Sequence, residues 1–265
     1  MGNENSIADT GAYAPAQPII HTIGPGDLRD ALAKGLADFE AMPTHVVFLC
    51  VIYPVVMLVA ARTYAGYDML PLLFPLLAGY TLIGPVVATG MYELSRRREK
   101  GLDFSRRKAF HILQRHATRS IGALGALLMV IYIAWLVTAL SLWKENFGEV
   151  APESIQEFLS QVFLTRDGWE LIIVGGGVGF LFALVVFTVS VVSFPMLMHR
   201  DVGIVMAVQT SIKAVVKNPV TMAMWGVIVA MAMLIGALPF FVGLAVVLPV
   251  LGHATWHVYR KVVEI

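Results

Sequence analysis

The segment Tyr92-Glu93-Leu94-Ser95-Arg96-Arg97-Arg98-Glu99-Lys100-Gly101 decides the fold, because it lies between two long apolar runs and opens a region dense in positive charge. Nine of the nineteen Lys and Arg residues occur from Arg96 to Arg119. Positive charge is retained on the side from which a membrane protein inserts, so such a segment is typical of a cytoplasmic loop. We therefore predict a cytoplasmic basic loop over residues 94–118, which orients the rest of the chain.

The composition agrees with a membrane protein. Of the 265 residues, 58% are hydrophobic and 14% are charged, whereas soluble domains carry about 25% charged residues. Six apolar runs are each near the roughly 20 residues that cross a bilayer, and they lie at about 44–62, 69–93, 119–143, 169–194, 220–238 and 240–259. We predict an all-α polytopic membrane protein, with a six-span domain over residues 27–265 and short amphipathic interfacial helices.

The distribution of charge tests this topology. With the N-terminus inside, sixteen of the nineteen basic residues fall in cytoplasmic segments and three fall outside, as the positive-inside rule requires. Both termini are then cytoplasmic, residues 144–168 form a periplasmic segment, and residues 1–26 form a disordered cytoplasmic tail. A short periplasmic helix is expected from Pro152 onward, because acidic residues fall in its first turn.

An amphipathic helix is predicted over residues 27–40. Its apolar stripe is Leu28, Leu32, Leu36 and Phe39, at spacings of three and four. Asp27 is expected to cap its N-terminus, and Pro43 is expected to mark its end. We expect this helix to lie flat at the membrane interface.

An internal repeat is predicted from matched landmarks. Pro85 is followed after seven residues by Tyr92 and then by Arg96-Arg97, while Pro249 is followed at the same spacings by Trp256 and then by Arg260-Lys261. An amphipathic segment that ends before a proline and a span also occurs twice, at residues 27–43 and 201–219. Repeats of this kind commonly underlie membrane folds.

His253 and His257 are the sharpest candidates for chemistry, because imidazoles at membrane depth are often functional. Their i, i+4 spacing places both rings on one helix face, so they cannot lie on opposite sides of one haem. We expect them to form hydrogen bonds with Trp256 and Tyr259, with no haem and no other cofactor. Ligation of haem or a metal is the alternative, in which His45 meets His257.

Glu93 is the second candidate. An ion pair with Arg96 or Arg97 would satisfy its carboxylate at little cost, and a proton-relay or substrate-binding role is the alternative. Gly175 and Gly179 form a small-xxx-small pair that favours close helix packing. Arg98 and its basic neighbours determine topology, and such clusters also attract anionic lipid headgroups.

Several functional classes lack support in the sequence. The only cysteine, Cys50, allows neither an intramolecular disulfide nor a cysteine-based metal site. The net charge of +1 gives no argument for nucleic-acid binding. The aqueous segments contain no nucleophile–base pair, paired carboxylates or cluster of metal ligands, so no enzymatic activity is predicted.

Three stretches carry a resemblance to a known family, namely Gly84-Pro85 through Arg97, Val192-Ser193-Phe194-Pro195 through Gly203, and Leu248-Pro249 through Arg260. They resemble a family of uncharacterised proteobacterial integral membrane proteins. The resemblance implies a protein of the bacterial inner membrane, without an activity. Some relatives are labelled as cytochrome c oxidase subunit I, but the histidine set for two haems and copper is absent here.

These observations lead to three hypotheses. The first is a non-enzymatic scaffold, accessory or assembly component of an inner-membrane complex, with the lipid bilayer, another membrane protein or a second copy as its partner. The second is a small-solute transporter or channel. The third is a protein associated with haem or the respiratory chain that uses His253 and His257.

Overall fold

The computed structural model describes residues 17–42, 67–102, 118–149, 151–239 and 241–264, and these ranges are largely helical. The helices in chain order are α1 (Pro25–Ala41), the 3-10 helix η1 (Tyr67–Leu72), α3 (Leu73–Glu99), α5 (Thr118–Phe147), α6 (Ile155–Leu164), α7 (Arg166–Ser190), α8 (Ser193–His199), α9 (Ile204–Lys217), α10 (Pro219–Ala237) and α11 (Leu244–Val262). Two short strands, β1 (Ile19–Ile20) and β2 (Val263–Glu264), complete the structure. The predicted all-α class is confirmed.

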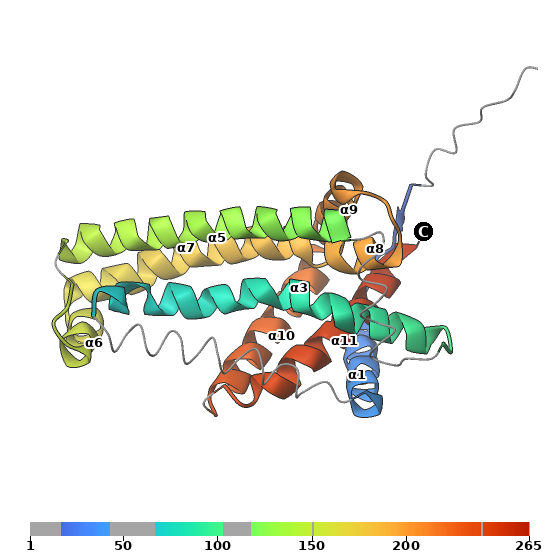
Figure 1. Ribbon diagram of the computed structural model, residues 1–265, viewed down its shortest axis with the longest axis horizontal. Coiled ribbons are helices and arrows are strands. Elements are labelled where there is room, and N and C mark those ends of the chain that lie inside the picture. Colours follow the sequence, from blue (N-terminus) through green and yellow to red (C-terminus); the bar gives the residue numbers. More distant parts are fainter. Residues whose placement is uncertain (1–16, 43–66, 103–117, 150, 240, 265) are drawn as a thin grey trace, which may run out of the picture.

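The helices α5 and α7 form a long hairpin, with α3 running alongside it (Figure 1). A β-carbon added to Gly179 of α7 would lie 3.0 Å from the indole of Trp135 on α5. The same indole lies 5.6 Å from the ring of Phe182, between ring centroids. Glycine therefore allows α7 to approach a large aromatic side chain closely, which is the packing role predicted for it.

The helix α6 closes the end of this hairpin (Figure 1). Ser154 caps it by accepting a hydrogen bond from the backbone nitrogen of Glu157 at 3.1 Å. Phe158 stacks on Trp143 of α5 at 5.5 Å between centroids. The helix predicted to begin near Pro152 is therefore present.

Among the described residues, three helical segments are long and apolar enough to cross a membrane: Arg119–Phe147, Arg166–His199 and Pro219–Ala237. They match the predicted spans 119–143, 169–194 and 220–238. Two more predicted spans correspond to α3 and α11, and the run 44–62 lies outside the described residues. The count of six spans stays a prediction.

The long apolar run from residue 220 to 259 divides into two helices, as expected. The helix α10 ends at Ala237 and α11 begins at Leu244. A β-carbon on Gly243 would lie 2.8 Å from the carbonyl oxygen of Gly236. Glycine at these two positions lets the chain reverse direction with the helix ends in contact.

The N-terminal segment pairs with the C-terminus. Ile19 lies opposite Glu264 and Ile20 opposite Val263 in an antiparallel pair. Asn218 holds the same segment, because its side chain accepts from the Ile23 nitrogen at 2.9 Å and donates to the His21 carbonyl at 3.0 Å. The predicted disordered tail is therefore wrong for residues 17–26, while residues 1–16 lie outside the described part.

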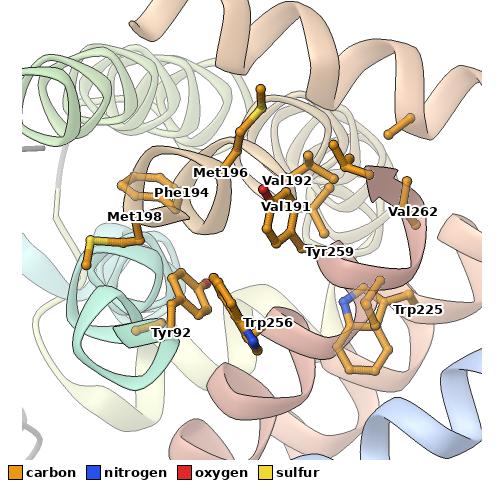
Figure 2. Close-up of a cluster of buried hydrophobic side chains, with 14 of the residues drawn as sticks. Tyr92, Val191, Val192, Phe194, Met196, Met198, Trp225, Trp256, Tyr259 and Val262 are labelled. Carbon is orange, nitrogen blue, oxygen red and sulfur yellow. The ribbon is translucent and has the colours of Figure 1, made fainter. Parts of the chain in front are cut away.

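The hydrophobic core lies where α3, α8, α10 and α11 meet (Figure 2). Tyr92 of α3 and Trp256 of α11, the two aromatics matched in the predicted repeat, both lie in this core. Val192, Phe194 and Met196, in and just before α8, pack into it from the end of the long hairpin. The core therefore joins the long hairpin to the C-terminal helices.

The helix α1 differs from its prediction in two ways. Its N-cap is Gly24, and Asp27 lies three residues further on, accepting the Gly24 backbone N–H at 2.9 Å. Its buried face is Leu28, Ala31, Gly35 and Asp38, whereas Leu36 is 46% exposed. The helix packs against α11, and the small residues Ala31 and Gly35 lie in its buried face beside Leu28.

The predicted basic loop begins too early. The helix α3 continues through Arg96, Arg97 and Arg98 to Glu99, and basic residues in its last turn interact favourably with the helix dipole. Residues 94–99 are therefore helical, and residues 103–117 of the predicted loop lie outside the described part.

Candidate functional site

The helices α1, α3 and α11 meet at closely approaching backbones. A β-carbon added to Gly35 of α1 would lie 2.6 Å from the backbone nitrogen of Ala254 on α11. A β-carbon on Gly252 of α11 would lie 3.1 Å from Cγ of Met91 on α3. Because the backbones approach closely here, polar side chains in the adjoining turns of the three helices come together.

Five side chains form what we call the polar junction: Asp38 of α1, Ser95 and Arg98 of α3, and His253 and His257 of α11. Asp38 Oδ2 accepts from Ser95 Oγ at 2.5 Å and lies 2.9 Å from His257 Nε2. Asp38 Oδ1 accepts from Arg98 Nη1 at 2.6 Å. The carboxylate thus joins three helices through three partners.

Asp38 is buried, with 7% of its side chain exposed. Burial alone would raise the pKa of its carboxyl group, but hydrogen bonds from His257, Ser95 and Arg98 together hold the pKa below its ordinary value. Asp38 is therefore ionised near neutral pH, with Arg98 as its counter-charge.

His253 is fully buried, and its Nδ1 lies 2.7 Å from Ser95 Oγ. A serine hydroxyl has one proton, and Ser95 gives it to Asp38. His253 Nδ1 must therefore be protonated and must donate to Ser95 Oγ. In the neutral ring, Nε2 then carries no proton and can only accept a hydrogen bond. Within the described part of the chain, Nε2 has no hydrogen-bond partner.

This arrangement contains Ser, His and Asp, but it is not a catalytic triad. In a triad the imidazole lies between the serine and the carboxylate, and it takes the serine proton. Here the serine lies between the imidazole and the carboxylate, with its proton directed to Asp38. The proton of Ser95 therefore goes to a carboxylate, and the imidazole of His253 is not placed to take it.

A second buried ionic cluster lies in the same part of α3, around Glu93. Glu93 is fully buried, and it accepts from Arg96 at 2.7 and 3.0 Å and from Arg97 at 3.0 Å. The ion pair predicted from the sequence is present, with both arginines rather than one. Two guanidinium partners compensate the desolvation of one carboxylate.

A cavity of about 470 Å³ lies beside the polar junction. Its rim carries ion pairs, because Glu99 accepts from Arg260 at 3.1 Å and from the Trp256 indole at 3.1 Å. Lys261 reaches Asp27 at 3.0 Å and Asp30 at 2.9 Å. The residues that line the cavity are Lys34, Ala37, Asp38, Ser95, Arg98, Glu99, His257, Arg260 and Lys261.

The two predicted histidines lie together, but their partners differ from those expected. They bond to Ser95 and Asp38, while Trp256 bonds to Glu99 and the Tyr259 hydroxyl lies 2.9 Å from His199. Trp256 and Tyr259 project from another side of α11 into the hydrophobic core (Figure 2). Among the described residues, no group of three His, Cys, Asp or Glu side chains is arranged to hold a metal ion.

The other residues predicted from the sequence do not lie together at one site. Gly179 packs against α5, whereas a β-carbon on Gly175 would meet only Leu171 of its own helix, at 3.9 Å. Pro85 lies within α3 and Pro249 within α11, and both helices deliver their C-terminal turns to the polar junction.

Asp38 and Ser95 were not identified from the sequence. Asp38 continues the small-residue line Ala31, Gly35 at spacings of four and three, and such a line predicts close helix contact. A carboxylate on that line would be buried and would require partners, which is the signal that could have identified it.

One family model matches the chain, over residues 73–199, and its description is "Predicted integral membrane protein (DUF2189)". The matched region runs from α3 to the end of α8 and includes Glu93, Ser95 and Arg98. No curated protein and no solved structure matches the chain. The family match and the three apolar helical segments agree that the chain is an integral membrane protein in contact with the lipid bilayer.

Proposed function

We propose that the protein is a non-enzymatic scaffold, accessory or assembly component of a larger membrane complex. The observation that carries the proposal is the outward face of α7. In the most apolar part of the segment Arg166–His199, none of the residues is buried by the described part of the chain. Among the described residues, this face is apolar and is left open to another membrane helix.

Glycines make this face suitable for a protein partner. Gly176 and Gly177 are exposed, and a β-carbon on either would meet nothing within 4 Å. They serve no packing purpose among the described residues, although glycine inside a helix costs about 1 kcal/mol relative to alanine. Outward glycines beside exposed Ile173 and Phe180 allow a second transmembrane helix to approach closely.

The polar junction supports a structural rather than a catalytic role. Asp38, Glu93 and Glu99 each accept at least two hydrogen bonds within the molecule. A self-satisfied network rigidifies the structure that contains it. It holds α1 and the ends of α3 and α11 in one arrangement.

We further propose six spans in a bacterial inner membrane, with both termini in the cytoplasm. The pairing of strands β1 and β2 supports this topology, because it would put both segments on one side of the membrane and would require an even number of crossings between them. Three apolar segments are described, and α3, α11 and residues 44–62 would bring the number to six.

Reporter fusions test this topology. Fusions between Lys100 and Arg119 are expected to report the cytoplasm, and fusions between Asn146 and Gln161 the periplasm. A periplasmic signal from the first set would reverse the proposed orientation.

The scaffold role is tested with a photo-crosslinking residue at Ile173, which is exposed about one turn before Gly176 on α7, in full-length protein expressed at its natural level. We expect a discrete crosslinked product containing another membrane protein, or a second copy of this chain. The matched control is the same residue at Val227, which is exposed on α10. A Gly176→Val variant is expected to remove the product without lowering thermal stability, because the added atoms meet nothing inside the molecule.

A transporter is less well supported. Thr138 and Ser141 of α5 donate to backbone carbonyls of their own helix, at 2.8 and 3.0 Å, and Ser193 of α8 donates to the carbonyl of Val189 in the last turn of α7 at 2.5 Å. These hydroxyls therefore do not offer a polar path across the apolar region. Uptake into vesicles that contain only this protein would favour the transporter over the scaffold.

A further inference from the structure

The residues that line the cavity beside the polar junction carry an excess of positive charge, although Asp27 and Asp30, which lie outside the lining, pair with its two lysines. Four of its lining residues are permanent cations (Lys34, Arg98, Arg260 and Lys261) and two are carboxylates (Asp38 and Glu99). Its floor is formed by Asp38 and Ser95, which are buried. Because Asp38 is ionised, an anion would be repelled from the floor and attracted to the rim.

The rim retains hydrogen-bond donors. A guanidinium group has five N–H donors. Arg98 directs Nη1 to Asp38 and Arg260 directs Nε to Glu99, so each keeps further N–H groups for a ligand. Lys34 is paired with Asp30 at 2.9 Å in an exposed contact, and such pairs are weak enough to be exchanged for another anion.

The position of the cavity identifies the class of ligand. It lies at the ends of α3 and α11, where the helices pass from apolar to charged sequence, and beside α1. Leu36 of α1, next to the lining residue Ala37, is an exposed apolar side chain. Basic residues over an apolar surface are the arrangement that holds a phosphate group at the membrane interface.

We propose that this cavity binds a phosphate group, supplied by the headgroup of an anionic phospholipid. Arg98 and Arg260 would contact the phosphate oxygens through paired N–H donors, and Lys34 and Lys261 would add positive charge at the rim. This inference requires membrane integration but not the scaffold role, so either can fail alone.

The test uses full-length protein in detergent, stripped of lipid and titrated with phosphatidylglycerol or phosphatidylcholine, with bound lipid counted by native mass spectrometry. We expect saturable binding of one phosphatidylglycerol and much weaker binding of phosphatidylcholine. The double variant Lys34→Gln, Arg260→Gln is expected to bind phosphatidylglycerol about 25-fold more weakly, since each basic residue near an anionic surface contributes about fivefold.

The matched control is the double variant Arg29→Gln, Lys213→Gln, which removes the same charge from exposed positions outside the cavity. Its affinity is expected to stay within about twofold of the wild type, since exposed charges outside the cavity do not contact the phosphate and are screened by salt. Arg260→Lys keeps the charge but lacks the paired N–H donors of a guanidinium group, so it should bind phosphatidylglycerol more weakly than the wild type and more tightly than the double-Gln variant. Equal losses in both double variants, or equal binding of the two lipids, would overturn the proposal.

Competition identifies the source of the phosphate. If inorganic phosphate or glycerol 3-phosphate displaces the lipid from the wild type, the phosphate site is supported and a soluble phosphate is its ligand. If neither competes at millimolar concentration, the phospholipid itself is the ligand. No binding of any of the three to stable wild-type protein would exclude the site.

Discussion

The α5–α7 hairpin and the polar junction are built by opposite means. In the hairpin, polar hydroxyls bond to their own helix, the contact between helices rests on Gly179 against Trp135, and the outward surface is apolar. In the polar junction, the charged side chain of Asp38 is buried and each helix depends on the others for its partners. We therefore expect the hairpin to tolerate changes in its neighbours better than the polar junction does.

This difference identifies where substitutions matter. An exposed apolar face in a membrane loses little when one side chain is altered. A buried carboxylate with partners from several helices loses its compensation when one partner is removed. The following predictions test the contrast, from the largest effect to the smallest.

Glu93→Gln is expected to have the largest effect. It leaves Arg96 and Arg97 beside a neutral, fully buried side chain, and removing one partner of a buried ion pair costs about 3–5 kcal/mol. Thermal unfolding in detergent measures the loss. Glu99→Gln is the control, because Glu99 is exposed and should cost no more than about 1 kcal/mol. Equal losses would show that burial does not distinguish these two carboxylates.

Gly35→Ala is expected to separate α1 from α11. The new methyl group would lie 2.6 to 2.8 Å from backbone and side-chain atoms of Ala254, and overpacking of this kind costs about 1–3 kcal/mol. Proteolysis after residue 34 should accelerate in parallel with the loss of stability. Gly26→Ala in the same helix meets nothing within 4 Å, and it should leave both measurements unchanged.

His257→Ala removes one partner of Asp38 and should lower stability by about 1–3 kcal/mol, because a buried acceptor loses a hydrogen bond. The wild type and the variant are both expected to be colourless, since His257 Nε2 is bonded to Asp38 and the unpartnered Nε2 of His253 is fully buried. A Soret band in the wild type that vanishes in His257→Ala would instead support haem binding.

Acid is expected to weaken the polar junction through Asp38. The pKa of its carboxyl lies below the ordinary value of 3.8 in the folded protein. The ionised form therefore stabilises the fold above that value, and this contribution is lost as pH falls through the folded-state pKa. The difference in melting temperature between wild type and Asp38→Asn should shrink from about pH 5 to about pH 3. A constant difference over this interval would show that folding does not lower the pKa of Asp38.

Thr138→Val on α5 is expected to change stability by less than about 0.5 kcal/mol, as for most substitutions away from a buried network. Its hydroxyl bonds only to the carbonyl of Ala134 on the same helix. A loss as large as that of His257→Ala would show that this part of the hairpin has a hidden polar partner.

The hairpin was readily predicted from the sequence, and the polar junction was predicted only in part. Long apolar runs directly indicate membrane spans, because a helix needs about 20 apolar residues to cross the bilayer. The Glu93 ion pair was also predictable, since its partners lie three and four residues away on the same helix. Asp38 was not, because its partners are 57, 60 and 219 residues distant in sequence.

The face of α1 shows the physical reason for the remaining error. Hydrophobic periodicity predicts that Leu32 and Leu36 are buried rather than Ala31 and Gly35, since larger side chains bury more apolar area. The helix instead turns its small residues toward α11 because the backbones approach closely there. Hydrophobic periodicity predicts that the helix forms, but which of its faces is buried depends on the helix that packs against it.

The pairing of β1 with β2 and of α1 with α11 has a consequence for biosynthesis. Asp38 and its partner His257 are separated by 219 residues, so α1 leaves the ribosome long before α11 exists. At about 5–20 residues per second the interval is roughly 10–45 s. During that time the carboxylate of Asp38 lacks its histidine partner, and no helix covers the face of α1 that carries Ala31 and Gly35. The polar junction therefore closes only when translation reaches the last helix, and a chain truncated before α11 presents an unpartnered α1 to membrane proteases.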